Sequence, residues 1–267
     1  FNRAGVPLME LVTEPDIKSA EEAIAFAKEL QLILRYLNIS NADMEKGQMR
    51  VEANVSVSKT SKMGTKVELK NINSFRAVFN AIEYELKRQE EILVNGGEII
   101  HETRGWNEKK SRTESQRTKE TSHDYRYFPE PDLPPLDLTQ FDLKSLKIEL
   151  PELPEAKRKR FIEEFNVSRE LVEQLIEHKT TADYFENAAS ELKLLLPTAT
   201  LQLLINYLTS DLKGLMNEYG MDLSPEANQP LAEKISPEHF AHLVMLVERE
   251  ELSSRLAKDV LHKMFET

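Results

Sequence analysis

Alternation of apolar and polar residues predicts strands in the first half of the chain. In QMRVEANVSVS (residues 48–58) every second residue is apolar, and side chains two apart share one face of a strand. The segment TKVELKNI (residues 65–72) repeats the alternation after Gly64 and is predicted to be its hairpin partner. PLMELVTEP (residues 7–15) and EIIHETRGW (residues 98–106) indicate two further strands.

Apolar residues three and four positions apart predict helices in the rest of the chain. Ser19 begins a helix that runs to about Leu37, and Glu22 lies three residues later, at the spacing of a capping box. A second helix is predicted from Ser74 to Val94, with Gly96 as its C-terminal cap. Beyond the proline-rich stretch at residues 128–138 the pattern is almost wholly helical.

These elements predict an α+β fold, with helices packed on a mixed or antiparallel sheet, followed by an all-helical domain. We place the boundary near residue 150, which gives domains at residues 1–150 and 151–267. Six or seven helices are expected in the second domain. Ser168 and Ser236 are predicted N-caps, and Pro237 suits the first position of a helix.

Composition limits the class of protein. The chain has no cysteine, which excludes disulfides and thiolate metal sites, and its net charge of -11 argues against indiscriminate nucleic-acid binding. No apolar run approaches the roughly 18 residues of a membrane-spanning helix, and no secretory signal is visible. We expect a cytoplasmic protein without membrane contact, or an organellar-matrix protein if the source is eukaryotic. The first residue is Phe, which predicts a fragment or a processed product.

Polar side chains on the predicted strands are the main candidates for chemistry, because the common phosphate-loop, dinucleotide and zinc-protease motifs are absent. Glu10 would lie between aliphatic neighbours, where it needs either a basic partner or a metal or phosphate. Arg50 and Glu52 fall on the polar face of the next strand, and Lys70 and Asn71 follow on its partner. Such groups suit Mg²⁺ and phosphoryl transfer, but also a solvated face with cross-strand ion pairs.

Two further stretches are open to more than one interpretation. The aromatic residues of HDYRYFPEPD (residues 123–132) could stack on a nucleotide base or anchor the connector by ring burial. The basic cluster KRKR (residues 157–160) wraps around its predicted helix, which favours a solvated helix end over an RNA-binding stripe.

Several long motifs resemble those of the B subunits of aspartyl/glutamyl-tRNA amidotransferases. They are FNRAGVPLMELVTEPDI, MEKGQMRVEANVSV, VELKNINSFRAVFNAIEYEL, RQEEILVNGGEIIHETRGW and HDYRYFPEPDLPPL. The helical remainder, including ISPEHFAHLVMLVE, resembles that family's helical domain and the start of its tail.

The resemblance implies an ATP-dependent carbon–nitrogen ligase that uses glutamine as amido donor. ATP phosphorylates the side-chain carboxylate of Glu-tRNA(Gln) or Asp-tRNA(Asn), and ammonia then displaces the phosphate. The implied partners are an amidase subunit that supplies the ammonia, a small third subunit and the misacylated tRNA. Which of the two tRNAs is used stays open. The alternative is a non-catalytic tRNA-binding or scaffold module, and residues 151–267 are expected to bind tRNA.

The resemblance also implies roles for individual residues. Glu10 and Glu52 would hold Mg²⁺, with Glu52 at a position more often occupied by Asp. Lys70 would be catalytic, and Lys70, Asn71 and Arg50 would contact the nucleotide. We expect the carboxyl groups of Glu10 and Glu52 to lie within about 8 Å of one another on facing strands, as two ligands of one ion. Part of the site is expected to precede Phe1.

Overall fold

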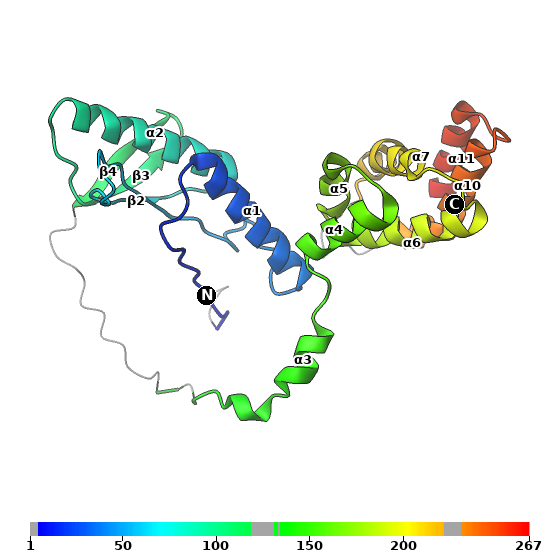
Figure 1. The fold of residues 1–267 in the computed structure, drawn as a ribbon, viewed down its shortest axis with the longest axis horizontal. Coiled ribbons are helices and arrows are strands. Elements are labelled where there is room, and N and C mark those ends of the chain that lie inside the picture. Colours follow the sequence, from blue (N-terminus) through cyan, green and yellow to red (C-terminus); the bar gives the residue numbers. More distant parts are fainter. Residues whose placement is uncertain (1–4, 119–130, 133, 222–230, 267) are drawn as a thin grey trace. The chain divides into compact units, whose positions relative to one another are not determined.

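The computed structural model describes residues 5–118, 131–132, 134–221 and 231–266, which Figure 1 traces along the chain. The chain packs as two units: Phe1–Leu30 with Asp43–Pro134, and Gln31–Ala42 with Pro135–Thr267. The predicted domain boundary near residue 150 stays a prediction, because compact packing is not independent folding. Most of the aromatic stretch at residues 123–132 lies outside the described residues.

A four-stranded mixed sheet lies at the centre of the first unit, in the order β1-β2-β3-β4. β1 (Ala53–Val55) pairs antiparallel with β2 (Val67–Lys70), and β2 pairs parallel with β3 (Glu102–Asn107). β3 pairs antiparallel with β4 (Arg112–Thr118). The parallel pair is joined through helix α2 (Phe75–Val94), since parallel neighbours need a long crossover. The predicted α+β class with a mixed sheet is confirmed.

The predicted hairpin is confirmed, although β1 has only three residues in the ladder. Beyond β1, a side chain of α2 takes the place of a neighbouring strand. Gln89 Nε2 donates to Val55 O at 3.1 Å, and Val57 N donates to Gln89 Oε1 at 3.0 Å. This exchange satisfies backbone groups that would otherwise lack a partner next to a buried helix.

The predicted strand at residues 7–15 is wrong. Residues 6–14 form no strand, and all of residues 5–18 are exposed. Leu8 is 91% exposed and Val12 is 79% exposed, so Glu10 does not lie between buried neighbours. A single extended segment becomes a strand only when another strand takes up its backbone hydrogen bonds, and no described strand pairs with this one.

Both predicted helices of the first half are confirmed, and their ends follow the predicted caps. In α1 (Ala20–Tyr36), Glu22 N donates to Ser19 Oγ, while Lys18 N donates to Glu22 Oε2 at 2.7 Å. In α2, Ala77 N donates to Ser74 Oγ at 3.1 Å. Gly96 follows α2 with a φ of 78°, the left-handed conformation that a helix C-terminus commonly requires of glycine.

The second unit is helical in its described part, as predicted. Its elements are η1 (Leu138–Gln140), α3 (Leu143–Glu149), α4 (Pro154–Phe165), α5 (Arg169–Ile176), α6 (Lys179–Leu195), α7 (Leu201–Asn206), the π-helical turn η2 (Tyr207–Leu212), α8 (Lys213–Glu218), α9 (Leu231–Lys234), α10 (Pro237–Glu248) and α11 (Ser254–Glu266). Ser236 caps α10, with Pro237 in its first position, whereas Ser168 occupies the cap position of α5 without a capping bond. None of the described helices has the length and apolar character needed to cross a bilayer.

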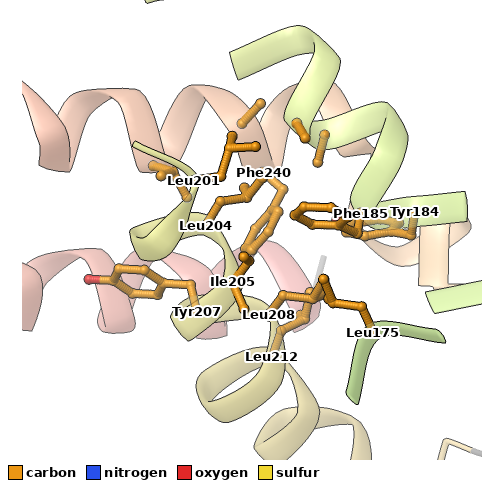
Figure 2. Close-up of a cluster of buried hydrophobic side chains, with 14 of the residues drawn as sticks. Leu175, Tyr184, Phe185, Leu201, Leu204, Ile205, Tyr207, Leu208, Leu212 and Phe240 are labelled. Carbon is orange, nitrogen blue, oxygen red and sulfur yellow. The ribbon is translucent and has the colours of Figure 1, made fainter. Parts of the chain in front are cut away.

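Aromatic and leucine side chains fill the core of this unit. Figure 2 shows Phe240 of α10 between Phe185 of α6 and Leu204 of α7. All three side chains have no exposed surface. Burial of each such side chain contributes roughly 1.5–3 kcal/mol, so this cluster is the main source of stability in the unit.

The KRKR cluster of α4 is a set of ion pairs, and only Lys159 projects into solvent. Lys157 is buried, with its Nζ 2.5 Å from Asp183 Oδ1 and 3.3 Å from Glu186 Oε2. Arg160 also reaches Glu186, at 2.7 Å. The interpretation as a solvated helix end is therefore wrong for most of the cluster, because carboxylates of neighbouring helices neutralise it.

We expect Glu186→Gln to lower the free energy of unfolding by about 1–2 kcal/mol at pH 7, because Lys157 and Arg160 each lose a charged acceptor. The hydrogen bond from Arg160 lowers the pKa of Glu186 below 4.5, against the opposing effect of burial. A folded carboxylate with a lowered pKa stabilises above its unfolded pKa. The difference between variant and wild type should thus shrink as the pH falls below 4.5.

Urea denaturation followed by the helical circular dichroism signal measures this difference. Glu163→Gln, at an exposed position of α4, is the matched control and should change little. Equal losses in both variants would contradict a specific role for the Glu186 ion pairs.

Candidate functional site

The two faces of the sheet differ in character. On β2, Val67 and Leu69 are buried in the apolar cluster that also contains residues of α2, so Glu68 and Lys70 point to the opposite side. The register then brings further residues onto that side. The face opposite α2, which we call the polar sheet face, carries Asn54, Glu68, Lys70, Thr103 and Gly105.

Lys70 lies at the centre of the polar sheet face and joins two carboxylates. Its Nζ is 3.2 Å from Glu52 Oε2 and 3.4 Å from Glu68 Oε1. Thr103 Oγ1 donates to the other oxygen of Glu68 at 2.8 Å. Partial burial alone would lower the pKa of Lys70, but the hydrogen bonds and charges of Glu52 and Glu68 outweigh it and raise that pKa. Lys70 is therefore a fixed cation, as a contact to phosphate or carboxylate oxygens requires.

The structure brings together some of the predicted site residues. Glu52 and Lys70 form an ion pair, and Asn71 follows Lys70 directly at the end of β2. Arg50 is exposed before β1, and within the described residues it has no ion pair. Glu10 is also exposed and unpaired there, so neither a buried salt bridge nor a buried metal ligand describes it. The predicted approach of Glu10 to Glu52 stays a prediction, although its premise of facing strands is wrong.

The carboxylates of the polar sheet face have the donor chemistry that Mg²⁺ requires. Glu52 and Glu68 offer hard oxygen ligands beside a cation that can hold phosphate. Both carboxylates pair with Lys70, so a metal ion would have to share these carboxylates with Lys70. In the described ranges no three His, Asp or Glu side chains form a group that could hold an ion. Two protein carboxylates with substrate oxygens and waters are sufficient for Mg²⁺.

A buried polar network lies on the other side of the sheet, and we did not predict it from the sequence. Glu85 of α2 has no exposed surface. It accepts hydrogen bonds from Arg88 at 2.6 Å, from Gln89 at 2.9 Å and from Thr113 of β4 at 3.0 Å. Arg104 of β3 lies 3.6 Å from the same carboxylate. The network thus connects α2 to the sheet through charge and not only through apolar contact.

Glu102 extends the network along β3. Arg104 Nη1 donates to Glu102 Oε1 at 2.6 Å, and Ser115 Oγ donates a short hydrogen bond to the other oxygen. Burial would raise the pKa of Glu102, but the bonds from Ser115 and Arg104 outweigh it and lower that pKa. One sequence signal was available: Glu85 and Gln89 are four residues apart, on the stripe of α2 that also carries Ile82.

Comparison with known proteins identifies the family. A family model described as the GatB/GatE catalytic domain matches residues 1–144, and one described as the GatB domain matches residues 183–267. The chain belongs to the B-subunit family of the aspartyl/glutamyl-tRNA amidotransferases. The polar sheet face therefore lies within the part that matches the catalytic model.

Curated relatives agree with this assignment. The B subunit of the aspartyl/glutamyl-tRNA(Asn/Gln) amidotransferase of Persephonella marina is 44% identical over 269 residues, which cover all of this chain and 54% of the relative. The proteins of the same name from Rickettsia rickettsii and Caldicellulosiruptor saccharolyticus are 44% and 42% identical over the whole chain, with 53% and 54% of each relative covered. The chain spans about half the length of these relatives.

We expect Glu85→Ala to destabilise the first unit by about 3–5 kcal/mol, because it leaves Arg88 and Arg104 without their buried counter-charge. Trp106 of β3 is the only tryptophan, so its fluorescence during urea denaturation reports on this unit. Glu83→Ala, on the same helix with a long ion pair to Lys87, should cost less than about 1 kcal/mol. A loss at Glu85 no greater than at Glu83 would show that the network contributes little.

Proposed function

We propose that this chain forms part of the subunit that activates and amidates the misacylated amino acid. The side-chain carboxylate of Glu-tRNA(Gln) or Asp-tRNA(Asn) attacks the γ-phosphorus of ATP and releases ADP. Ammonia then attacks the resulting acyl phosphate, forms the amide and releases phosphate. Phosphorylation is needed because a carboxylate is a poor electrophile. Membership of the family and the Lys70-centred polar sheet face within the catalytic match support this proposal.

Each candidate residue has a proposed role. Lys70, held charged by Glu52 and Glu68, binds phosphoryl oxygens of the nucleotide. Glu52 and Glu10 are the proposed carboxylate ligands of Mg²⁺, which when bound neutralises charge on the transferring phosphate. Asn71 and Arg50 contact the nucleotide. Glu52 would hold the ion next to Lys70, and Glu68 would keep Lys70 charged and in place.

The proposed partners are an amidase subunit, a small third subunit and the misacylated tRNA. The name of the curated relatives describes one subunit of an amidotransferase acting on tRNA. Because the relatives are named as one subunit of the amidotransferase, we infer that a partner releases the ammonia from glutamine. Free ammonia should then replace glutamine as the nitrogen source.

A non-catalytic tRNA-binding module is the weaker candidate. Its natural contact would be the densest basic cluster, but carboxylates already neutralise Lys157, Arg158 and Arg160. Residues 151–267 are still proposed to contact tRNA, through surfaces other than this cluster.

Lys70→Met in the full-length subunit, assembled with its partners, should lower ATP-dependent transamidation by roughly 10²-fold, because the cation at the phosphoryl oxygens is lost. The affinity for tRNA should change little. Measurement of amidated tRNA with ammonia as donor separates this step from glutamine hydrolysis. Lys66→Met, an exposed lysine just before β2, is the matched control. Full activity of the Lys70 variant would refute the proposed role.

A further inference from the structure

The polar sheet face has no side chain at one central position, where β3 carries Gly105. Gly105 is buried in the middle of β3, with Lys70 of β2 and Glu114 of β4 as its partners in the ladder. A Cβ atom placed on Gly105 would lie 2.2 Å from Gln116 Nε2 and 3.2 Å from Asn71 Nδ2. Two carboxamides from different parts of the chain therefore converge over this glycine.

A β-bulge gives Gln116 this position. The register steps from Thr103 opposite Arg117 to Arg104 opposite Ser115, so Gln116 is an extra residue without a partner on β3. Bulges re-aim side chains and occur often beside active sites. In a regular ladder Gln116 would pair opposite Thr103.

Asn71 approaches Gly105 from a left-handed backbone conformation, with a φ of 59°. Asn adopts this conformation more readily than other non-glycine residues, as Asn38 and Asn166 also do here. Within the described residues, neither the Asn71 nor the Gln116 carboxamide has a hydrogen-bond partner. Both side chains are exposed, so a ligand can reach them.

We propose that Gln116 and Asn71 hold an oxyanion of the substrate over Gly105, with Lys70 as the adjacent cation. Two amide donors and an ammonium match acceptor oxygens that carry negative charge. Within the proposed function, on which this inference rests, two such groups exist: a phosphoryl group of ATP and the side-chain carboxylate of the esterified amino acid. Gln116 is a substrate-contact residue in either case, and a side chain at Gly105 would displace its carboxamide.

An NMR titration of the isolated chain tests the site without turnover. The probes are inorganic phosphate and N-acetylglutamate α-amide, which offers only the side-chain carboxylate. The side-chain NH₂ resonances of Gln116 and Asn71 should shift saturably with at least one probe. A response to phosphate alone identifies the nucleotide as the source, and a response to the carboxylate alone identifies the amino acid. Gln202, whose amide donates to Asn206 at 2.8 Å, is the control resonance and should not move.

Two variants complete the test. Gln116→Leu and Gly105→Ala should each weaken the affinity for the probe, as read from the Asn71 resonance, about tenfold. Gln202→Leu should not change this affinity. In the assembled amidotransferase, Gln116→Leu should raise KM for the matching substrate more than it lowers kcat. Unmoved Gln116 resonances, or equal shifts at Gln202, would overturn the proposal. Binding in the titration without any ATP-dependent amidation by the assembled enzyme would instead contradict the proposed function alone.

Discussion

The buried carboxylate of Glu85 is the constraint on which the first unit depends. An ionised carboxylate without exposed surface is tolerated only when hydrogen bonds and opposite charge replace its hydration. Arg88 and Gln89 meet this need from the same helix, and Thr113 meets it from β4. Because Gln89 also binds the backbone at Val55, the network ties α2 to β1 and β4, the two edge strands of the sheet.

The buried network and the polar sheet face are opposite sides of the same strands. On β3, Arg104 points toward Glu85, whereas its neighbours Thr103 and Gly105 lie on the polar sheet face. Strand alternation makes these two sets inseparable, because a shift of β3 by one residue would exchange them. The network therefore fixes which residues of β3 face α2, and so places Gly105 on the polar sheet face. The buried ion pairs on the α2 side of the sheet therefore help to hold the residues of the candidate site in place.

The sequence by itself determined the elements whose signals are local. Ser19 and Ser74 begin helices because their hydroxyls accept from nearby backbone N–H groups, whatever the rest of the chain does. The hairpin of β1 and β2 follows from alternation, and it alone brings Glu52 to Lys70. The long motifs shared with a known family indicated the family, which no periodicity could have indicated.

Tertiary structure decided everything that needed a distant partner. Residues 7–15 have the pattern of a strand, but a strand exists only where another backbone pairs with it. Lys157 has the sequence context of a surface cation, yet carboxylates of α6 surround it in the fold. The bulge that turns Gln116 over Gly105 depends on the β3–β4 register. Local sequence carries propensity and period, whereas pairing, burial and register are set only when segments far apart in the chain meet.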